Sequence, residues 1–268
     1  MRREFTLSYL TTAPLEAGDV LLLAEKVGYC AIGVRLAPLL PGGHFSPLSE
    51  NPVLLRQTLA RMKDTGVKVF DVDGVRLDQA FRRGSFDRQL GVAAELGAKV
   101  VTVIGDDPDE ERTVDSFAEL CDAAAVYDLA VTLEFMPYSV TSNFNSALHI
   151  VRHAQRPNAR ILLDLLHANR SHMSCEDIAA TPPGCLSHAQ LCDAPAEIPT
   201  IREELIHTAR YARLLPGTGG INVRGMTEAL PDNLPLSIEI PNTEQVALLG
   251  TEEWARRCLL ATQQALET

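Results

Sequence analysis

The chain has 268 residues, of which 46% are hydrophobic and 22% charged, a composition typical of a globular enzyme large enough for one α/β barrel. Its formal net charge of −11 argues against nucleic acid as a partner, because there is no basic stripe to neutralise phosphates. No run reaches the ~18 apolar residues of a membrane span, and the first residues pass directly into a strand pattern. Because the six cysteines form no CxxC pair, we expect reduced thiols and a cytoplasmic protein.

Strand and helix patterns alternate along the first half of the chain. Short apolar runs predict strands, and runs with a 3.6-residue apolar period predict helices. The predicted strands are 5–10 (FTLSYL), 30–36 (CAIGVRL), 67–75 (VKVFDVDGV) and 99–105 (KVVTVIG). The predicted helices are 15–27, a segment starting near Pro52, 86–96 and 106–128, the last with acidic residues at its start, as a helix N-terminus prefers.

The second half continues the same alternation. Its predicted strands are 130–137 (AVTLEFMP), 159–167 (ARILLDLLH), 185–195 (CLSHAQLCDAP) and 234–242 (LPLSIEIPN). Its predicted helices are 142–154, 175–180, 200–213, 223–230 and 250–266. Eight strand-then-helix units without a break in composition predict one α/β domain over residues 1–268, a single (β/α)8 TIM barrel. A doubly wound open sheet is the alternative, but eight strands without GxGxxG after the first count against it.

Four of the predicted strands carry a potential metal ligand near their carboxyl ends: Glu134, Asp164, Gln190 and Glu239. Carboxylates in apolar surroundings are costly to bury unless a cation neutralises them. Active sites of TIM barrels lie at this end of the strands, so we expect the four side chains to bind one divalent ion. An oxygen-rich ligand set favours Mn²⁺, Mg²⁺ or Co²⁺ over Zn²⁺. His188 shares a strand face with Gln190, so either residue is a candidate ligand on strand seven.

Other residues are candidates for contact with a substrate. His167 follows Asp164 by three residues and is either a substrate donor or a capping residue in the following loop. Arg210 and Arg213 precede the PGTGG turn; they either bind an anionic group of the substrate or lie on a helix surface. His44 lies in a glycine-rich loop that can reach the pocket mouth, which Phe45 and Tyr138 are candidates to line.

The segments LEFMP, LDLLH, HAQLCDAP, RLLPGTG and SIEIP, in this order, resemble the xylose isomerase-like superfamily of sugar isomerases and epimerases. The resemblance covers essentially the whole barrel. It implies that Glu134, Asp164, Gln190 and Glu239 bind one metal ion and that His167 contacts substrate. Many keto-sugar epimerases of this family have histidine at the position of Gln190 and an arginine six residues later, where this chain has Ala196. The glutamine in HAQ and the RYARLLPGTGGI segment are similar to hydroxypyruvate isomerases and 3-dehydroshikimate dehydratases.

The branches of this superfamily share one difficult step, the removal of a proton next to a carbonyl. We expect the metal to chelate a carbonyl and a neighbouring hydroxyl, and Glu134 and Glu239 to remove and return the proton through an enediolate. We expect His167, His188 and Arg213 to bind the substrate. The predicted activity is that of an isomerase or epimerase; loss of a β-hydroxyl instead gives a lyase of the 3-dehydroshikimate dehydratase type, and a non-catalytic ligand-binding barrel is the third alternative. Barrels of this type often form dimers or tetramers.

Overall fold

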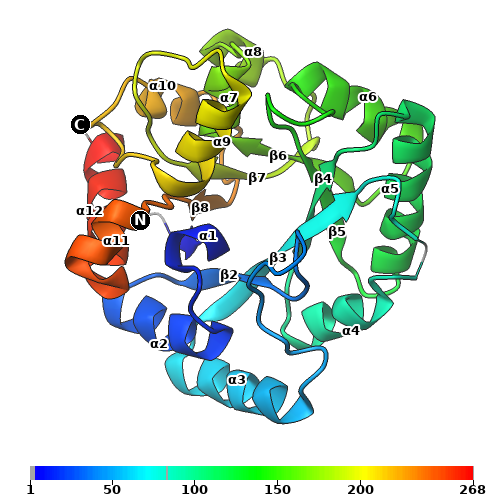
Figure 1. The fold of residues 1–268 in the computed structure, drawn as a ribbon, viewed down its shortest axis with the longest axis horizontal. Helices are drawn as coiled ribbons and strands as arrows, with labels where there is room; N and C mark the ends of the chain where they lie inside the picture. The colour runs from blue at the N-terminus through cyan, green and yellow to red at the C-terminus, as the bar shows by residue number, and fades with distance from the viewer. Residues whose placement is uncertain (1–3, 83, 268) are drawn as a thin grey trace.

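The computed structural model describes residues 4–82 and 84–267, in which eight parallel strands close into a barrel in chain order. The helices form an outer ring around the strands (Figure 1). The strands are β1 Phe5–Leu7, β2 Ala31–Arg35, β3 Lys68–Leu77, β4 Val100–Gly105, β5 Ala130–Glu134, β6 Ala159–Asp164, β7 Leu186–Leu191 and β8 Leu236–Ile238. The predicted TIM barrel is confirmed. Within the described residues, no helix has the length and hydropathy needed to cross a membrane.

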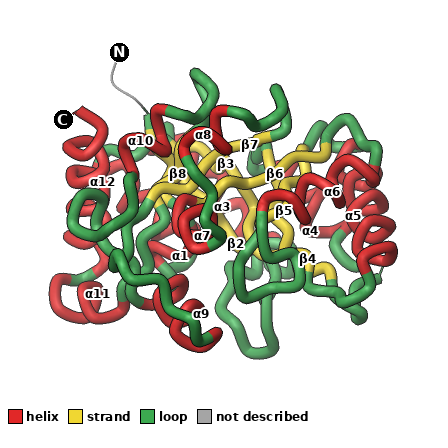
Figure 2. Tube along the Cα trace, turned by 90° about the horizontal axis from the view of Figure 1, so that it is seen from above, coloured by secondary structure: helices red, strands yellow, loops and turns green. Residues whose placement is uncertain are grey.

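The helices connect consecutive strands and close the chain. They are α1 Tyr9–Thr12, α2 Ala17–Val27, α3 Pro52–Thr65, α4 Asp87–Glu95, α5 Glu110–Ala125, α6 Phe144–Ala154, α7 Leu165–Arg170, α8 Cys175–Ala179, α9 Arg202–Tyr211, α10 Val223–Glu228, α11 Thr243–Leu249 and α12 Thr251–Glu267. Helices α9 and α11 lie on the same side of the strands (Figure 2).

Local sequence signals set several helix boundaries. The Asn51 side chain accepts hydrogen bonds from the N–H groups of Val53 and Leu54 at the start of α3, where Pro52 takes the first helical position. Gly66 ends the same helix in the left-handed conformation. Asn143 and Ser146 cap each other at the start of α6. These caps orient helices that bury their apolar faces against the barrel.

Most of the predicted strands are shorter in the structure, and at the first and the sixth strand the difference shapes the site. The first strand ends at Leu7, and Tyr9 and Leu10 belong to α1, because the backbone turns at Ser8. The sixth strand ends at Asp164, whose side chain caps α7, so His167 lies in a helix and not at a strand end. Both turns bring polar side chains to the carboxyl end of the barrel.

Candidate metal centre

The four predicted ligands lie at the carboxyl ends of consecutive strands. Glu134 and Asp164 are the last residues of β5 and β6, Gln190 is the penultimate residue of β7, and Glu239 directly follows β8. All four are buried, and Asp164 is fully enclosed. The structure therefore brings together the side chains that the sequence predicts as one site.

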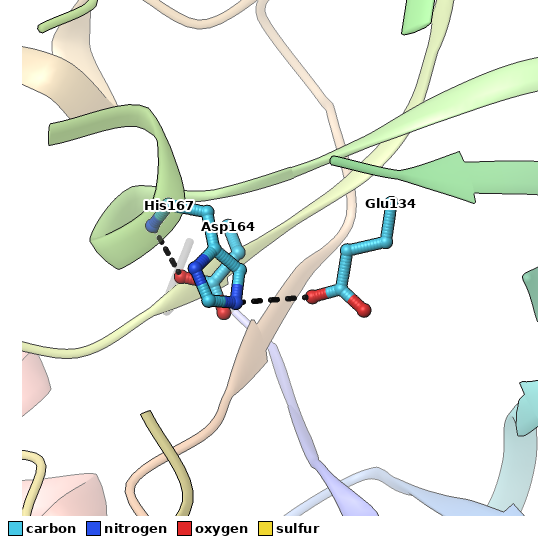
Figure 3. Close-up of side chains that lie close together, drawn as sticks. All are labelled: Glu134, Asp164 and His167. Atoms are coloured by element: carbon cyan, nitrogen blue, oxygen red, sulfur yellow. Dashed lines mark hydrogen bonds and ion pairs between the residues drawn. The ribbon is translucent and has the colours of Figure 1, made fainter. Parts of the chain in front are cut away.

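Glu134, Asp164 and His167 form the tightest part of the site (Figure 3). One donor atom from each lies within 4.8 Å of the others. The His167 Nε2 is 3.7 Å from Glu134 Oε1. Asp164 Oδ1 accepts hydrogen bonds from the N–H groups of Leu166, at 2.7 Å, and His167, at 3.4 Å. The carboxylate that caps α7 thus also holds the backbone of His167, whose imidazole is close enough to join the ligand set.

Arg213 connects the other side of the site. Its Nη1 lies 2.6 Å from Asp164 Oδ2, and its Nη2 lies 2.8 Å from Glu239 Oε2. The side chain is 1% exposed, and its Nε donates a hydrogen bond to the carbonyl of Ala209. Of the two alternatives for Arg213, a helix surface is therefore wrong, and the guanidinium lies inside the barrel.

Arg213 supplies the site with an arginine although position 196 is alanine. Position 196, six residues after Gln190, is alanine, but Arg213, which follows α9, enters the site from later in the chain. The absence of an arginine at position 196 therefore does not mean that the site lacks one.

Gln190 faces Glu239 across the gap between β7 and β8. Its Nε2 donates to Glu239 Oε1 at 3.0 Å, and the same oxygen accepts a 2.5 Å hydrogen bond from Ser8 Oγ. The Gln190 Oε1 is buried and has no hydrogen-bond partner among the described residues. A buried carbonyl oxygen normally has a hydrogen-bond partner, and a bound cation would supply the partner that this oxygen lacks.

The charges of the site also fit a divalent cation. Glu134, Asp164 and Glu239 supply three carboxylates and Arg213 one guanidinium, so with every group ionised a formal charge of −2 is left uncompensated. Carboxylate and amide oxygens suit Mn²⁺, Mg²⁺ and Co²⁺, and the nearby imidazole also suits Zn²⁺. The donor set therefore fits one divalent ion.

His188 lies deeper on β7 than Gln190 and is fully buried. Its Nδ1 is 2.8 Å from Ser187 Oγ, and its ring meets Phe70 edge-on, with 5.2 Å between the ring centroids. The Nε2 has no partner among the described residues. Gln190, and not His188, makes the hydrogen bond to Glu239, so the geometry favours Gln190 as the ligand on β7.

Burial and mutual charge shift the ionisation of the site. Burial, with the charges of Glu239 and Asp164, raises the pKa of Glu134 well above its ordinary value. Burial also raises the pKa of Glu239 to about 7, against the opposing charge of Arg213. Burial works against ionisation of Asp164 too, but Arg213 and His167 outweigh it and lower the pKa of this carboxyl. Burial lowers the pKa of His167 to about 4, which keeps the imidazole neutral and able to bind a metal.

A second polar group lies where the end of β2 pairs with the middle of β3. The Arg35 guanidinium pairs with Asp73 and lies 4.4 Å above the ring of Tyr9. The Tyr9 hydroxyl is 3.0 Å from His44 Nδ1 and donates to the His44 carbonyl at 2.8 Å. His44 therefore reaches the mouth, as the sequence allows. Tyr138 also lines the site, with its ring edge-on to His167 at 5.5 Å.

Asp193 is a structural residue of the site that the sequence interpretation missed. Its Oδ1 accepts from the N–H groups of Ala194 and Ile221, and its Oδ2 accepts from those of Gly217 and Gly219. One carboxylate therefore organises the PGTGG turn that follows Arg213. Its place in LCDAP, two residues after the last residue of β7, is the signal that the sequence offered.

Residues 21–259 match the family described as xylose isomerase-like TIM barrel. The chain belongs to this family. The chain is also similar to the 3-dehydroshikimate dehydratase of Pseudomonas aeruginosa, with 26% identity over 182 residues. The match covers 64% of this chain but only 28% of the dehydratase, so the chain corresponds to little more than a quarter of that protein.

Solved structures share the fold at low sequence identity. The IOLI protein with a bound zinc atom superimposes with a TM-score of 0.79 at 21% identity, covering 99% of this chain and 98% of that one. A D-psicose 3-epimerase from Clostridium cellulolyticum H10, solved with D-tagatose, has a TM-score of 0.76 at 15% identity, covering 99% and 100%. These likenesses establish the barrel architecture of this family member.

Proposed function

We propose that this family member is a metal-dependent isomerase or epimerase of a small hydroxy-carbonyl compound, either a sugar or a keto acid. The observation that carries the proposal is the placement of two buried carboxyl groups, Glu134 and Glu239, on β5 and after β8, with Asp164 and Gln190 between them. In a closed barrel this order places the two glutamates on different sides of the ligand set.

The glutamates supply the two proton transfers that such a reaction needs. A divalent ion held by Glu134, Asp164, Gln190 and Glu239, with His167 close by, supplies Lewis-acid polarisation of a carbonyl. One glutamate removes the proton on the carbon next to that carbonyl, and the other returns a proton to the enediolate on the same or the adjacent carbon. Asp164 is the weaker base, because its ion pair with Arg213 lowers the pKa of this carboxyl and so makes its protonation unfavourable.

The neighbouring side chains position the substrate in this proposal. Arg213 donates to Asp164 and Glu239 and fixes both carboxylates. His167 and Tyr138 form one wall beside Glu134. His188 lies deeper in the barrel than Gln190. Contact of His188 and of Arg213 with the substrate remains a prediction. A cytoplasmic location and a dimeric or tetrameric assembly are likewise proposals.

A lyase of the 3-dehydroshikimate dehydratase type is the second candidate. The sequence match to the dehydratase of Pseudomonas aeruginosa supports it, as does glutamine at the strand-seven position. The first proton removal is the same, but a hydroxyl on the next carbon then leaves with its electron pair and takes up a proton to form water. The two candidates therefore share residues and differ in the fate of the enolate.

Elemental analysis of the purified protein tests the metal centre before a substrate is known. Glu134→Gln and Glu239→Gln are compared with wild type after reconstitution with Mn²⁺, Mg²⁺, Co²⁺ or Zn²⁺, and Glu228→Gln on the exposed face of α10 is the control. We expect about one metal per chain in wild type and control, and much less in the site variants. No metal in reconstituted wild type would contradict the proposal and favour a non-catalytic binding barrel.

The reaction is then assigned with two readouts on the metal-loaded protein. Deuterium from solvent entering the substrate carbon of a keto-sugar or hydroxypyruvate supports the isomerase or epimerase. An ultraviolet-absorbing aromatic product from 3-dehydroshikimate supports the lyase. Activity that is unchanged after complete chelation excludes both.

A further inference from the structure

A cavity of about 490 Å³ lies at the mouth of the barrel, beside the proposed metal centre. Its wall comes from α1 and the turn after it, the loop after β2, the end of α9 and the start of α11. Three of these segments directly follow site residues: α1 follows Ser8, the Pro241 segment follows Glu239, and the loop after β2 follows Arg35. A molecule in this cavity is therefore next to the ligand set.

The wall of the cavity is mainly apolar. Leu10, Leu39, Leu40 and Val246 contribute aliphatic side chains, together with proline and alanine residues. The polar side chain of Thr11 is already engaged, because its hydroxyl donates to the Ile238 carbonyl and accepts from the Ile240 N–H. A polyhydroxylated ligand needs a partner for each hydroxyl that it buries, and this wall offers few.

Two arginines give the cavity its remaining polar character. Arg35 uses one end of its guanidinium for Asp73, and its Nε is buried beside Gly74 of β3 and closed to solvent. Arg210 lines the cavity from α9, and its side chain makes no hydrogen bond or ion pair within the described part of the chain. Because Asp73 already neutralises Arg35, the two arginines leave about one positive charge for a ligand. This charge matches a carboxylate better than a dianionic phosphate.

We propose that this cavity is the substrate subsite for a carboxylate carried on an apolar, ring-sized skeleton, with Arg210 binding the carboxylate. The inference rests on the proposed function, because the reacting carbonyl of the same substrate would lie at the proposed metal centre. It selects keto acids with few hydroxyls over free sugars. Burial opposes the charged form of Arg35, but the nearby charges of Asp73 and Glu239 raise the pKa of its guanidinium, whereas the charge of Arg210 acts to lower the pKa of the Tyr138 hydroxyl.

Binding of a simple probe tests the subsite without requiring turnover. Cyclohexanecarboxylate is titrated by calorimetry into metal-loaded and metal-depleted protein, and cyclohexylmethanol and D-fructose are titrated in parallel. We expect saturable binding of the carboxylate, and at least about tenfold weaker binding of the alcohol, since a charge-assisted contact of this kind is worth about one decade. Equal binding of the alcohol, or preference for D-fructose, would overturn the inference.

Variants locate the binding. We expect Arg210→Met to weaken carboxylate binding about tenfold, and Arg56→Met, on the exposed face of α3 outside the cavity, to leave it unchanged. Val246→Trp fills the cavity from α11 and should abolish binding, with thermal melting to confirm that each variant is folded. Unchanged binding in both Arg210→Met and Val246→Trp would place the carboxylate elsewhere and overturn the subsite.

The failure of the subsite can be separated from failure of the metal centre. Glu134→Gln should lose metal and still bind the carboxylate within a few-fold, because the cavity does not include Glu134. Carboxylate binding in wild-type protein that takes up no metal after reconstitution supports the subsite and contradicts the proposed function. Metal uptake with deuterium exchange but without carboxylate binding supports the proposed function and contradicts the subsite.

Discussion

The guanidinium Nη1 of Arg213 lies 2.6 Å from Oδ2 of Asp164, and both side chains are almost completely enclosed by the barrel. The same guanidinium also pairs with Glu239. A buried charge that loses its partner is strongly destabilising, since neither water nor another charge replaces it. Arg213 therefore stabilises the fold as well as ordering the site.

Replacing Arg213 by methionine tests this dependence. We expect Arg213→Met to lower the free energy of unfolding by about 3–5 kcal/mol in metal-depleted protein, because two buried carboxylates lose their cation. Saturating Mn²⁺ should recover part of the loss, since a bound divalent ion neutralises the same carboxylates. Urea unfolding with and without metal measures both effects. Arg56→Met is the control and should change stability by less than about 0.5 kcal/mol; an equally small effect of Arg213→Met would show that the pair is not needed.

The identity of the strand-seven ligand gives a second prediction. We expect Gln190→Leu to lower metal affinity by about 10- to 100-fold, because it removes a ligand oxygen and the hydrogen bond to Glu239. Gln190→His supplies a nitrogen ligand and should keep most of the metal. His188→Gln should leave metal content near that of wild type. Metal titration followed by elemental analysis compares the three variants, and loss of metal in His188→Gln alone would assign the ligand to His188.

The sequence was sufficient to predict the barrel and the four candidate ligands. Each candidate is an isolated polar residue at the end of an apolar strand, and β-strand periodicity together with the TIM-barrel rule places such residues at one site. His167 was predicted near the site but on the wrong element, because the cap that Asp164 provides for α7 depends on backbone geometry rather than on a recognised motif.

The long-range pairings of the site were not predictable in the same way. Arg213 follows a ten-residue helix, α9, and nothing local distinguishes it from Arg210, which is half-buried at the mouth. The destination of its side chain depends on how the segment after α9 folds back onto β7 and β8, through the pairing of Asp193 with Leu214 and of Ala212 with Asn242. Such pairings join residues far apart in the chain and leave no periodic pattern.

Asp193 offers a third prediction about that returning segment. We expect Asp193→Ala to lower the free energy of unfolding by about 2–4 kcal/mol, because four backbone N–H groups lose a charged acceptor. We also expect weaker metal binding, since the loosened turn no longer positions Arg213. Urea unfolding and metal titration measure the two effects, and Asp232→Ala, at an exposed position before β8, is the control. A variant with wild-type stability and metal affinity would show that the turn is held by other contacts.

Asp71, on β3 and outside the ligand set, is expected to make the stability of the protein depend on pH. The carboxyl group is 2% exposed, and its Oδ1 has no hydrogen-bond partner among the described residues. Gly33 leaves just enough room for it, because a Cβ at that glycine would lie 2.9 Å from the same oxygen. Burial, with the charges of Asp73 and Glu239, raises the pKa of Asp71 from 3.8 to about 8.

The raised pKa means that the folded protein holds a proton on Asp71 that the unfolded chain releases above its ordinary pKa. This contribution to stability is fully present below a pH of about 4 and is lost as the pH rises to about 8, at a cost of up to about 5 kcal/mol. Asparagine has nearly the same shape and does not ionise. In metal-depleted protein we therefore expect Asp71→Asn to be more stable than wild type near pH 8 and to approach it near pH 4. Urea unfolding across this range, with Asp64→Asn on the exposed face of α3 as the control, measures the difference. A stability difference that does not change with pH would mean that Asp71 ionises in the folded state as it does in the unfolded chain.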